Sequence, residues 1–193
     1  MNLTLLTAQL LTILDKFKIV LLPTHLPGHR NVRADALSRL GHASPTEWRL
    51  GHEALDKLFS AWGQPTIDLF ATKENKVLPI FCSPYPDESA WAVDALSIAW
   101  DDFQLAYAFP PQAIVPKVLQ KIRESKGSTF ILVASQSPSR PWLPILLELS
   151  VAQRLELNDV LILYQYLPGF NEPEFHPDPS TLSLAGWLLS SPL

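Results

Sequence analysis

The sequence predicts an α/β domain in which helices flank a mostly parallel β-sheet. Short apolar runs alternate with segments of helical periodicity from residue 66 to residue 164, and the connections between them are short. Such alternation is typical of strands joined by crossover helices, which place neighbouring strands parallel. The composition, with 47% hydrophobic and 18% charged residues in a chain of 193, is that of a globular protein and excludes an intrinsically disordered one.

Three helices and one strand are expected before this alternating region. Leucine and isoleucine recur at helical spacing over residues 2–17, and the short apolar run at 19–22 predicts a strand. Asn31 can cap a short helix that continues through Ser38, and a longer helix ends at Gly63.

The alternating region itself is expected to contain four strands and two helices. The strands are expected at 66–70, 105–109, 129–134 and 160–164, and the helices at 114–124 and 141–150. Pro144 predicts a kink in the second helix. Four tryptophans with mostly apolar or acidic neighbours are assigned to the core: Trp62, Trp91, Trp100 and Trp142.

These elements divide the chain into three regions. Residues 1–42 form a small helix–strand–helix region, residues 43–166 form the α/β domain, and residues 167–193 are rich in proline and lack sustained periodicity. The last region is therefore expected to be an extended tail.

Charge and cysteine content exclude several classes of protein. A formal net charge of −4 argues against a generally basic protein that coats nucleic acid, and the single Cys82 excludes a disulfide framework. No apolar run reaches the roughly 20 residues that a membrane span needs, and the first residues lack a basic signal-peptide region. A location in the cytoplasm or nucleus, with no membrane partner, is expected.

The first motif runs from His25 to Arg39. It reads His-Leu-Pro-Gly-His-Arg-Asn-Val-Arg-Ala-Asp-Ala-Leu-Ser-Arg and follows a helix and a strand. This string resembles the C-terminal end of the RNase H domain of retroelement reverse transcriptases. The resemblance implies that Asp35 corresponds to a metal-binding carboxylate and that His25 assists proton transfer or product departure. Two Mg²⁺ ions need several converging carboxylates, and the chain supplies one, so the Mg²⁺ site is a vestige and no hybrid cleavage is expected.

The second motif begins at Ile67-Asp68-Leu69-Phe70 and continues to Phe109-Pro110-Pro111-Gln112. In this order after an RNase H end, it resembles the Dam-like adenine-N6 methyltransferase region of DIRS-type retrotransposon polyproteins. The resemblance implies a Rossmann-like, methyltransferase-like sheet with S-adenosylmethionine at its carboxyl edge. It also implies that Asp68 and Asn75 contact the adenosyl group.

The resemblance further implies that residues 109–112 replace a catalytic tetrad, N/D-P-P-Y/F/W, that holds a flipped adenine. Phe109 offers no acceptor for the adenine amine, and Gln112 stands in place of the stacking ring. Loss of such an acceptor costs about 1.5–3 kcal/mol in the ground state and more in the transition state. We therefore expect no methyl transfer and no bound cofactor. Alternatively, Phe109-Pro110-Pro111 is only a strand end turned by prolines, and Asp68 is a strand-end carboxylate that binds a neighbouring loop.

These observations predict a fragment of a DIRS-like reverse-transcriptase polyprotein without enzymatic activity of its own. Its partners are expected to be the rest of the polyprotein and, weakly, nucleic acid, through Arg30, Arg33 and Arg39. Two alternatives remain. One is a divergent S-adenosylmethionine-dependent adenine methyltransferase that uses Asp94 or Asp101 as acceptor, and the other is a host-domesticated interaction module without chemistry.

Overall fold

The computed structural model describes residues 3–20, 22, 48–101, 103–158, 162–165 and 172–192. The chain separates into two compact units, Met1–Arg39 and Leu40–Leu193. In the first unit, α1 (Leu3–Lys16) is the helix that the leucine spacing predicts. The described part of the apolar run at 19–22 is not a strand, and the expected helix at 31–38 lies outside the described residues.

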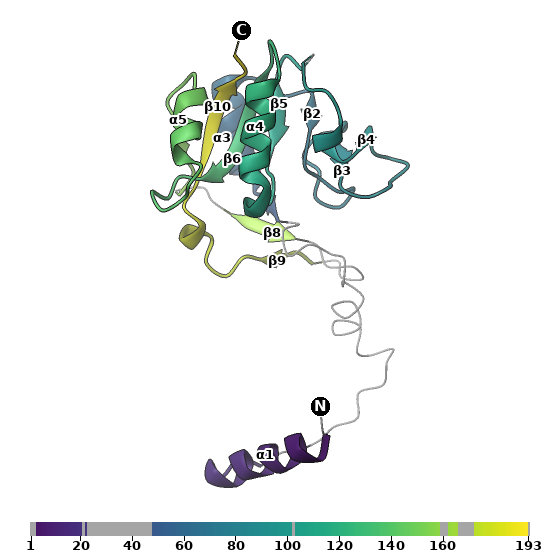
Figure 1. Ribbon diagram of the computed structural model, residues 1–193, viewed down its shortest axis with the longest axis vertical. Helices are drawn as coiled ribbons and strands as arrows, with labels where there is room; N and C mark the ends of the chain where they lie inside the picture. Colours follow the sequence, from purple (N-terminus) through teal and green to yellow (C-terminus); the bar gives the residue numbers. More distant parts are fainter. Residues whose placement is uncertain are drawn as a thin grey trace. The chain divides into compact units, whose positions relative to one another are not determined.

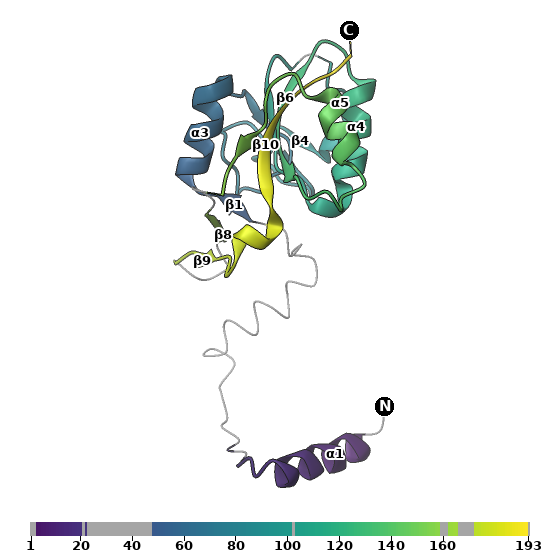
Figure 2. The same cartoon turned by 90° about the vertical axis from the view of Figure 1, so that its left-hand side faces the viewer.

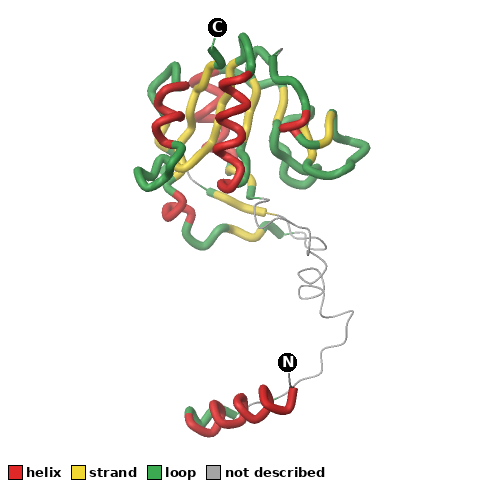
Figure 3. Tube along the Cα trace, viewed as in Figure 1, coloured by secondary structure: helices red, strands yellow, loops and turns green. Residues whose placement is uncertain are grey.

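A five-stranded mixed sheet forms the centre of the second unit (Figures 1 and 3). Its strands, in spatial order, are β2 (Ile67–Asp68), β5 (Ala106–Ala108), β6 (Thr129–Ser135), β10 (Leu184–Ser190) and β7 (Leu155–Glu156). β2, β5 and β6 run parallel, whereas β10 is antiparallel to both of its neighbours. The α/β class is confirmed, with one reversed strand in the sheet.

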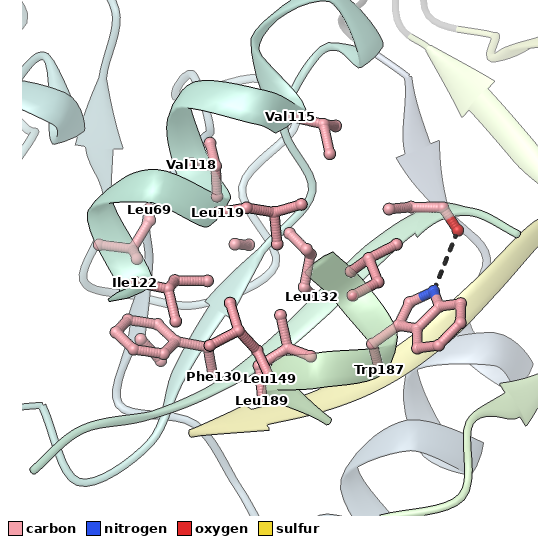
Figure 4. Packing of buried hydrophobic residues seen from close by; sticks show 14 of the residues in the cluster. Leu69, Val115, Val118, Leu119, Ile122, Phe130, Leu132, Leu149, Trp187 and Leu189 are labelled. Carbon is pink, nitrogen blue, oxygen red and sulfur yellow. Dashed lines mark hydrogen bonds between the residues drawn. The ribbon is translucent and has the colours of Figure 1, made fainter. Parts of the chain in front are cut away.

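Helices cover both faces of this sheet. Figure 2 shows α3 (His52–Trp62) on one face and α4 (Val115–Glu124) and α5 (Leu143–Leu149) on the other. The buried side chains of β6 alternate between the two layers, because successive residues of a strand point to opposite faces. Phe130 and Leu132 belong to the cluster with α4 and α5, whereas Ile131 belongs to the cluster with α3. Figure 4 shows the first cluster, in which the Trp187 indole donates to the Ala134 carbonyl at 3.4 Å.

Two small sheets extend the domain. β1 (Arg49–Leu50), β8 (Leu163–Gln165) and β9 (Glu174–Phe175) form an antiparallel sheet in the order β1-β8-β9. β3 (Cys82–Ser83) and β4 (Ala92–Val93) form a parallel pair, which a parallel bridge between Asp68 and Phe81 joins to β2. Three 3₁₀ turns complete the described elements: η2 (Ala95–Ser97), η3 (Gln112–Ile114) and η4 (Pro179–Leu182).

The structure differs from the sequence-based expectation in its last third. The strand expected at 160–164 appears as β8, but it pairs with β1 and β9 instead of completing the parallel sheet. Residues 184–190, expected in an extended tail, form β10 between β6 and β7. Because most of β10 is buried on both faces, its side chains show no alternation of polar and apolar residues that would mark a strand.

The kink predicted at Pro144 and the burial predicted for four tryptophans can be compared with the structure. Pro144 lies in the first turn of α5, where a missing N–H costs nothing, so the expected kink is absent from this seven-residue helix. Trp100 and Trp142 are buried as expected, and Trp62 is half-buried. Trp91, by contrast, is 57% exposed beside the edge strand β4.

Glycine at one position lets a helix approach the sheet closely. Gly186 of β10 faces α3, and a Cβ atom there would overlap with Leu58 Cδ2 and come within 3.3 Å of Trp62 Cζ3. The absent side chain therefore sets the distance between α3 and the centre of the sheet.

Candidate functional site

A cavity of about 210 Å³ lies where the chain leaves the parallel strands β2 and β5. Its lining residues come from the segments that follow β2, β3, β4 and β5: Leu69, Phe70, Ala71, Thr72, Asn75, Cys82, Ser83, Pro84, Tyr85, Asp94, Ala95, Leu96, Phe109, Pro111 and Ile114. In open α/β sheets, ligands bind beyond the carboxyl ends of the strands, because the connecting loops diverge there. We call this cavity the strand-end pocket.

Asp68 holds the loop that forms one wall of the strand-end pocket. Its side chain is 2% exposed, and one carboxylate oxygen, Oδ1, accepts from the Phe70 N–H at 3.3 Å while Oδ2 accepts from the Val77 N–H at 3.1 Å. Burial raises the pKa of Asp68 to about 6, against the opposing effect of these two hydrogen bonds and of Arg49. Both oxygens thus bind the first part of the β2–β3 connection, residues 69–77, which we call the β2–β3 loop. This supports the loop-binding alternative, and a contact with an adenosyl group stays a prediction.

Asn75 also serves this loop and lines the pocket. Its Oδ1 accepts from the Thr72 N–H at 2.6 Å and from the Thr72 hydroxyl at 3.3 Å, which closes a tight turn. The sequence assigns Asp68 and Asn75 to one site, and in the structure both side chains accept hydrogen bonds from residues of the same loop. Each of the two therefore has a structural partner within that loop.

The segment Phe109-Pro110-Pro111-Gln112 separates two cavities. Phe109 and Pro111 line the strand-end pocket, and all four residues line a second cavity of about 260 Å³ on the side of β8 and β9. Gln112 begins η3, and its Oε1 is buried with no hydrogen-bond partner in the described part of the chain. The four residues therefore lie together at the end of β5, with an apolar ring at the first position.

The second cavity has an aromatic wall that sequence reasoning missed. Trp48 and His176 pack edge to face there, with ring centroids 5.0 Å apart. The two residues are far apart in the sequence and meet only because β1 and β9 flank β8. Neither residue lies in a motif, so no local signal in the sequence identifies them.

Two further side chains define the chemistry of the strand-end pocket. Asp94 has a positive φ of 55°, and its Oδ1 accepts from the Leu96 N–H at 3.1 Å at the start of η2. Cys82 is buried, and this burial, followed by the charges of Asp68 and Asp94, raises its pKa to about 11. A thiol with this pKa is protonated at neutral pH, so Cys82 is not an activated nucleophile.

Other residues that the sequence singled out lie elsewhere. Asp101 accepts from the Lys126 N–H at 2.9 Å and does not line the strand-end pocket. The RNase H-like motif falls outside the described residues, including its predicted catalytic and contact residues His25, Arg30, Arg33, Asp35 and Arg39. Within the described ranges, His, Cys, Asp and Glu side chains form no group of three or more that could bind a metal.

Comparison with known proteins adds no family assignment. No model of a protein family matches the sequence, and no curated protein matches it. Among the helices of the described residues, none is long and apolar enough to cross a membrane.

Proposed function

We propose that the second unit is a methyltransferase-like domain of a DIRS-type retroelement polyprotein that serves as a scaffold and does not transfer methyl groups. The observation that carries this proposal is the position of Phe109-Pro110-Pro111 at the end of β5, beside the strand-end pocket. In an adenine methyltransferase the corresponding segment lies between the bound cofactor and the target base. The division of two cavities by residues 109–112 supports the same arrangement.

The order of the strands gives independent support. When the bridge between Asp68 and Phe81 is included, the order is β4-β3-β2-β5-β6-β10-β7, and β10 is reversed between β6 and β7. This order resembles that of Rossmann-like methyltransferase domains, in which one reversed strand lies next to an edge strand. The β2–β3 connection departs from that pattern, because turns without a helix join these two strands.

The chemistry of the pocket argues against methyl transfer. An attacking amine gains positive charge in the transition state, and a polar acceptor must stabilise that charge. Phe109 presents a hydrocarbon ring to the pocket, and Gln112 lines only the second of the two cavities. Because this segment places no side-chain acceptor in the strand-end pocket and no ring at its fourth position, we infer that the remaining role is to support neighbouring parts of a polyprotein.

Methyl transfer and ligand binding test the proposal directly. The purified full chain is incubated with methyl-labelled S-adenosylmethionine and adenine-containing DNA, and binding of S-adenosylmethionine is measured by calorimetry. We expect no labelled DNA and no saturable binding in the micromolar range. Saturable micromolar binding or transfer at an enzymatic rate would contradict the scaffold proposal.

A divergent methyltransferase is the second candidate, because the Asp94 carboxylate lines the same pocket as Phe109. If transfer is detected, Asp94→Asn distinguishes a pocket carboxylate from a contaminating enzyme. Asp101→Asn is the matched control, since Asp101 lies outside the pocket lining. Loss of transfer in Asp94→Asn alone would establish this second candidate.

A further inference from the structure

The β2–β3 loop is held at both ends by one side chain. Asp68 is the last residue of β2, Phe70 lies at the start of the loop, and Val77 lies at its end. A single ionised carboxylate accepts from both backbone N–H groups. Residues 69–77 supply four consecutive residues, from Leu69 to Thr72, and Asn75 to the strand-end pocket.

We propose that Asp68 is a pH-responsive clasp, which keeps the pocket wall closed when its carboxylate is ionised and releases one end of the loop when it is protonated. A protonated carboxyl group carries a hydroxyl donor on one oxygen, and that oxygen accepts more weakly than an ionised carboxylate oxygen does. One of the two loop contacts is therefore weakened on protonation. The remaining contacts of the loop, such as the turn between Thr72 and Asn75, do not involve Asp68.

The surroundings of Asp68 bring its change of protonation close to pH 6. Burial opposes the charge and raises the pKa of Asp68 to about 6. The ionisable groups that interact with it come from three strands: Arg49 of β1, Tyr107 of β5 and Cys82 of β3. Of these, the Arg49 charge favours the ionised carboxylate, whereas burial holds the phenol of Tyr107 and the thiol of Cys82 neutral near pH 7. Asp68 is therefore the group in this cluster that changes charge near pH 6.

Local and global effects of this protonation have opposite signs. Protonation removes the cost of a buried charge, so the contribution of Asp68 to the stability of the domain increases as the pH falls. The same protonation weakens one hydrogen bond to the loop. Acidification thus opens the wall of the pocket while the contribution of Asp68 to the stability of the folded domain increases. This difference distinguishes the mechanism from ordinary acid unfolding.

Amide hydrogen exchange of the full chain, measured by NMR, tests the proposal. Protection factors of the Phe70 and Val77 amides are compared at about pH 7.5 and about pH 5, with the amides of β6 as the reference for global opening. We expect protection at Phe70 or Val77 to fall by about tenfold or more at the lower pH, since one hydrogen bond loses its charge assistance. Protection in β6 should not fall. Unchanged protection of both loop amides, or a parallel loss in β6, would overturn the proposal.

Two variants complete the test. In Asp68→Asn, a single carbonyl oxygen replaces two acceptors, so protection at one of the two amides should be low at both pH values, with no pH response. Asp94→Asn is the matched control, because Asp94 lines the same pocket but its side chain contacts η2 instead of this loop. Wild-type protection with a pH response in Asp68→Asn, or loss of the response in Asp94→Asn, would show that Asp68 is not the clasp.

Discussion

Substitution of Gly186 by alanine tests the close contact between α3 and the sheet. The backbone of Gly186 does not have a positive φ, so alanine can adopt its conformation. The new methyl group, however, would overlap with Leu58 Cδ2, and Leu58 is fully buried. Overpacking of this kind typically costs about 1–3 kcal/mol, and the reduced entropy of the unfolded chain offsets about 0.4–1 kcal/mol. We expect Gly186→Ala to lower the free energy of unfolding by about 1–2 kcal/mol.

A double-mutant cycle identifies the cause of that loss. Leu58→Ala alone should cost about 2–5 kcal/mol, because it leaves a cavity against β10. In that background the methyl group at position 186 no longer meets Leu58, so Gly186→Ala should be neutral or stabilising by up to about 1 kcal/mol. The two substitutions should therefore couple by roughly 2 kcal/mol. Gly127→Ala is the control, since Gly127 has a φ of 65° and no neighbouring atom within 4 Å, so its cost should not change with Leu58.

Urea unfolding followed by tryptophan fluorescence measures all four stabilities. The six tryptophans all lie in the second unit, so the signal reports on this unit and not on α1. Equal costs of Gly186→Ala in the two backgrounds would refute the assignment of the penalty to Leu58. A cost below about 0.5 kcal/mol in the wild-type background would refute the close approach itself.

Three further results are expected. Burial raises the pKa of Asp68 from 3.8 to about 6, so its protonated form stabilises the folded state in full below about pH 4, and this contribution, about 3 kcal/mol, is lost as the pH rises through 6. The difference in unfolding free energy between wild type and Asp68→Asn should therefore change over this pH range. A constant difference would refute the buried charge. Cys82, buried with a pKa of about 11, should react with a thiol reagent at neutral pH many-fold more slowly than in the urea-unfolded chain, and equal rates would contradict its burial. Arg123 and Glu148 form an ion pair at 2.6 Å on exposed side chains, so Arg123→Ala should cost less than about 1 kcal/mol in urea unfolding, and a larger loss would show a buried role.

The sequence predicted the first part of the α/β domain well, because its signals are local. The apolar stripe Val115, Val118, Leu119 and Ile122 marks α4, and all four side chains are buried. The apolar run of β6 likewise marks a central strand. Spacing and residue type are sufficient here, since the elements are long and each has a continuous apolar face.

The later part of the domain depends on pairings that no local pattern encodes. Leu184–Ser190 reads as a short apolar stretch after several prolines, and only pairing with β6 and β7 identifies it as an inner strand. β8 was expected from its apolar residues, but its partners β1 and β9 were not. A two-residue strand such as β1 has no period to detect, so its position follows from tertiary contacts alone.

The candidate site divides in the same way. The motif that contains Asp68 and the segment Phe109–Pro111 were both assigned to one site, and the chain segments that they begin do meet at the strand-end pocket. The roles given to them come from a resemblance and remain predictions. Cys82 and Tyr85 also line the pocket, and tertiary contacts, namely the parallel bridge of Asp68 with Phe81 and the hydrogen bond from the Ala71 N–H to the Cys82 carbonyl, bring their segment alongside β2.

The position of β10 has a consequence during translation. A ribosome makes β6 some fifty residues before it makes Leu184–Ser190, so the apolar edge of β6 emerges without the strand that later covers it. Until then, the nascent chain cannot cover the edge of the parallel strands, and it presents a surface that chaperones bind and that other chains can pair with. Premature termination before residue 184 should therefore yield an insoluble product instead of a smaller folded domain.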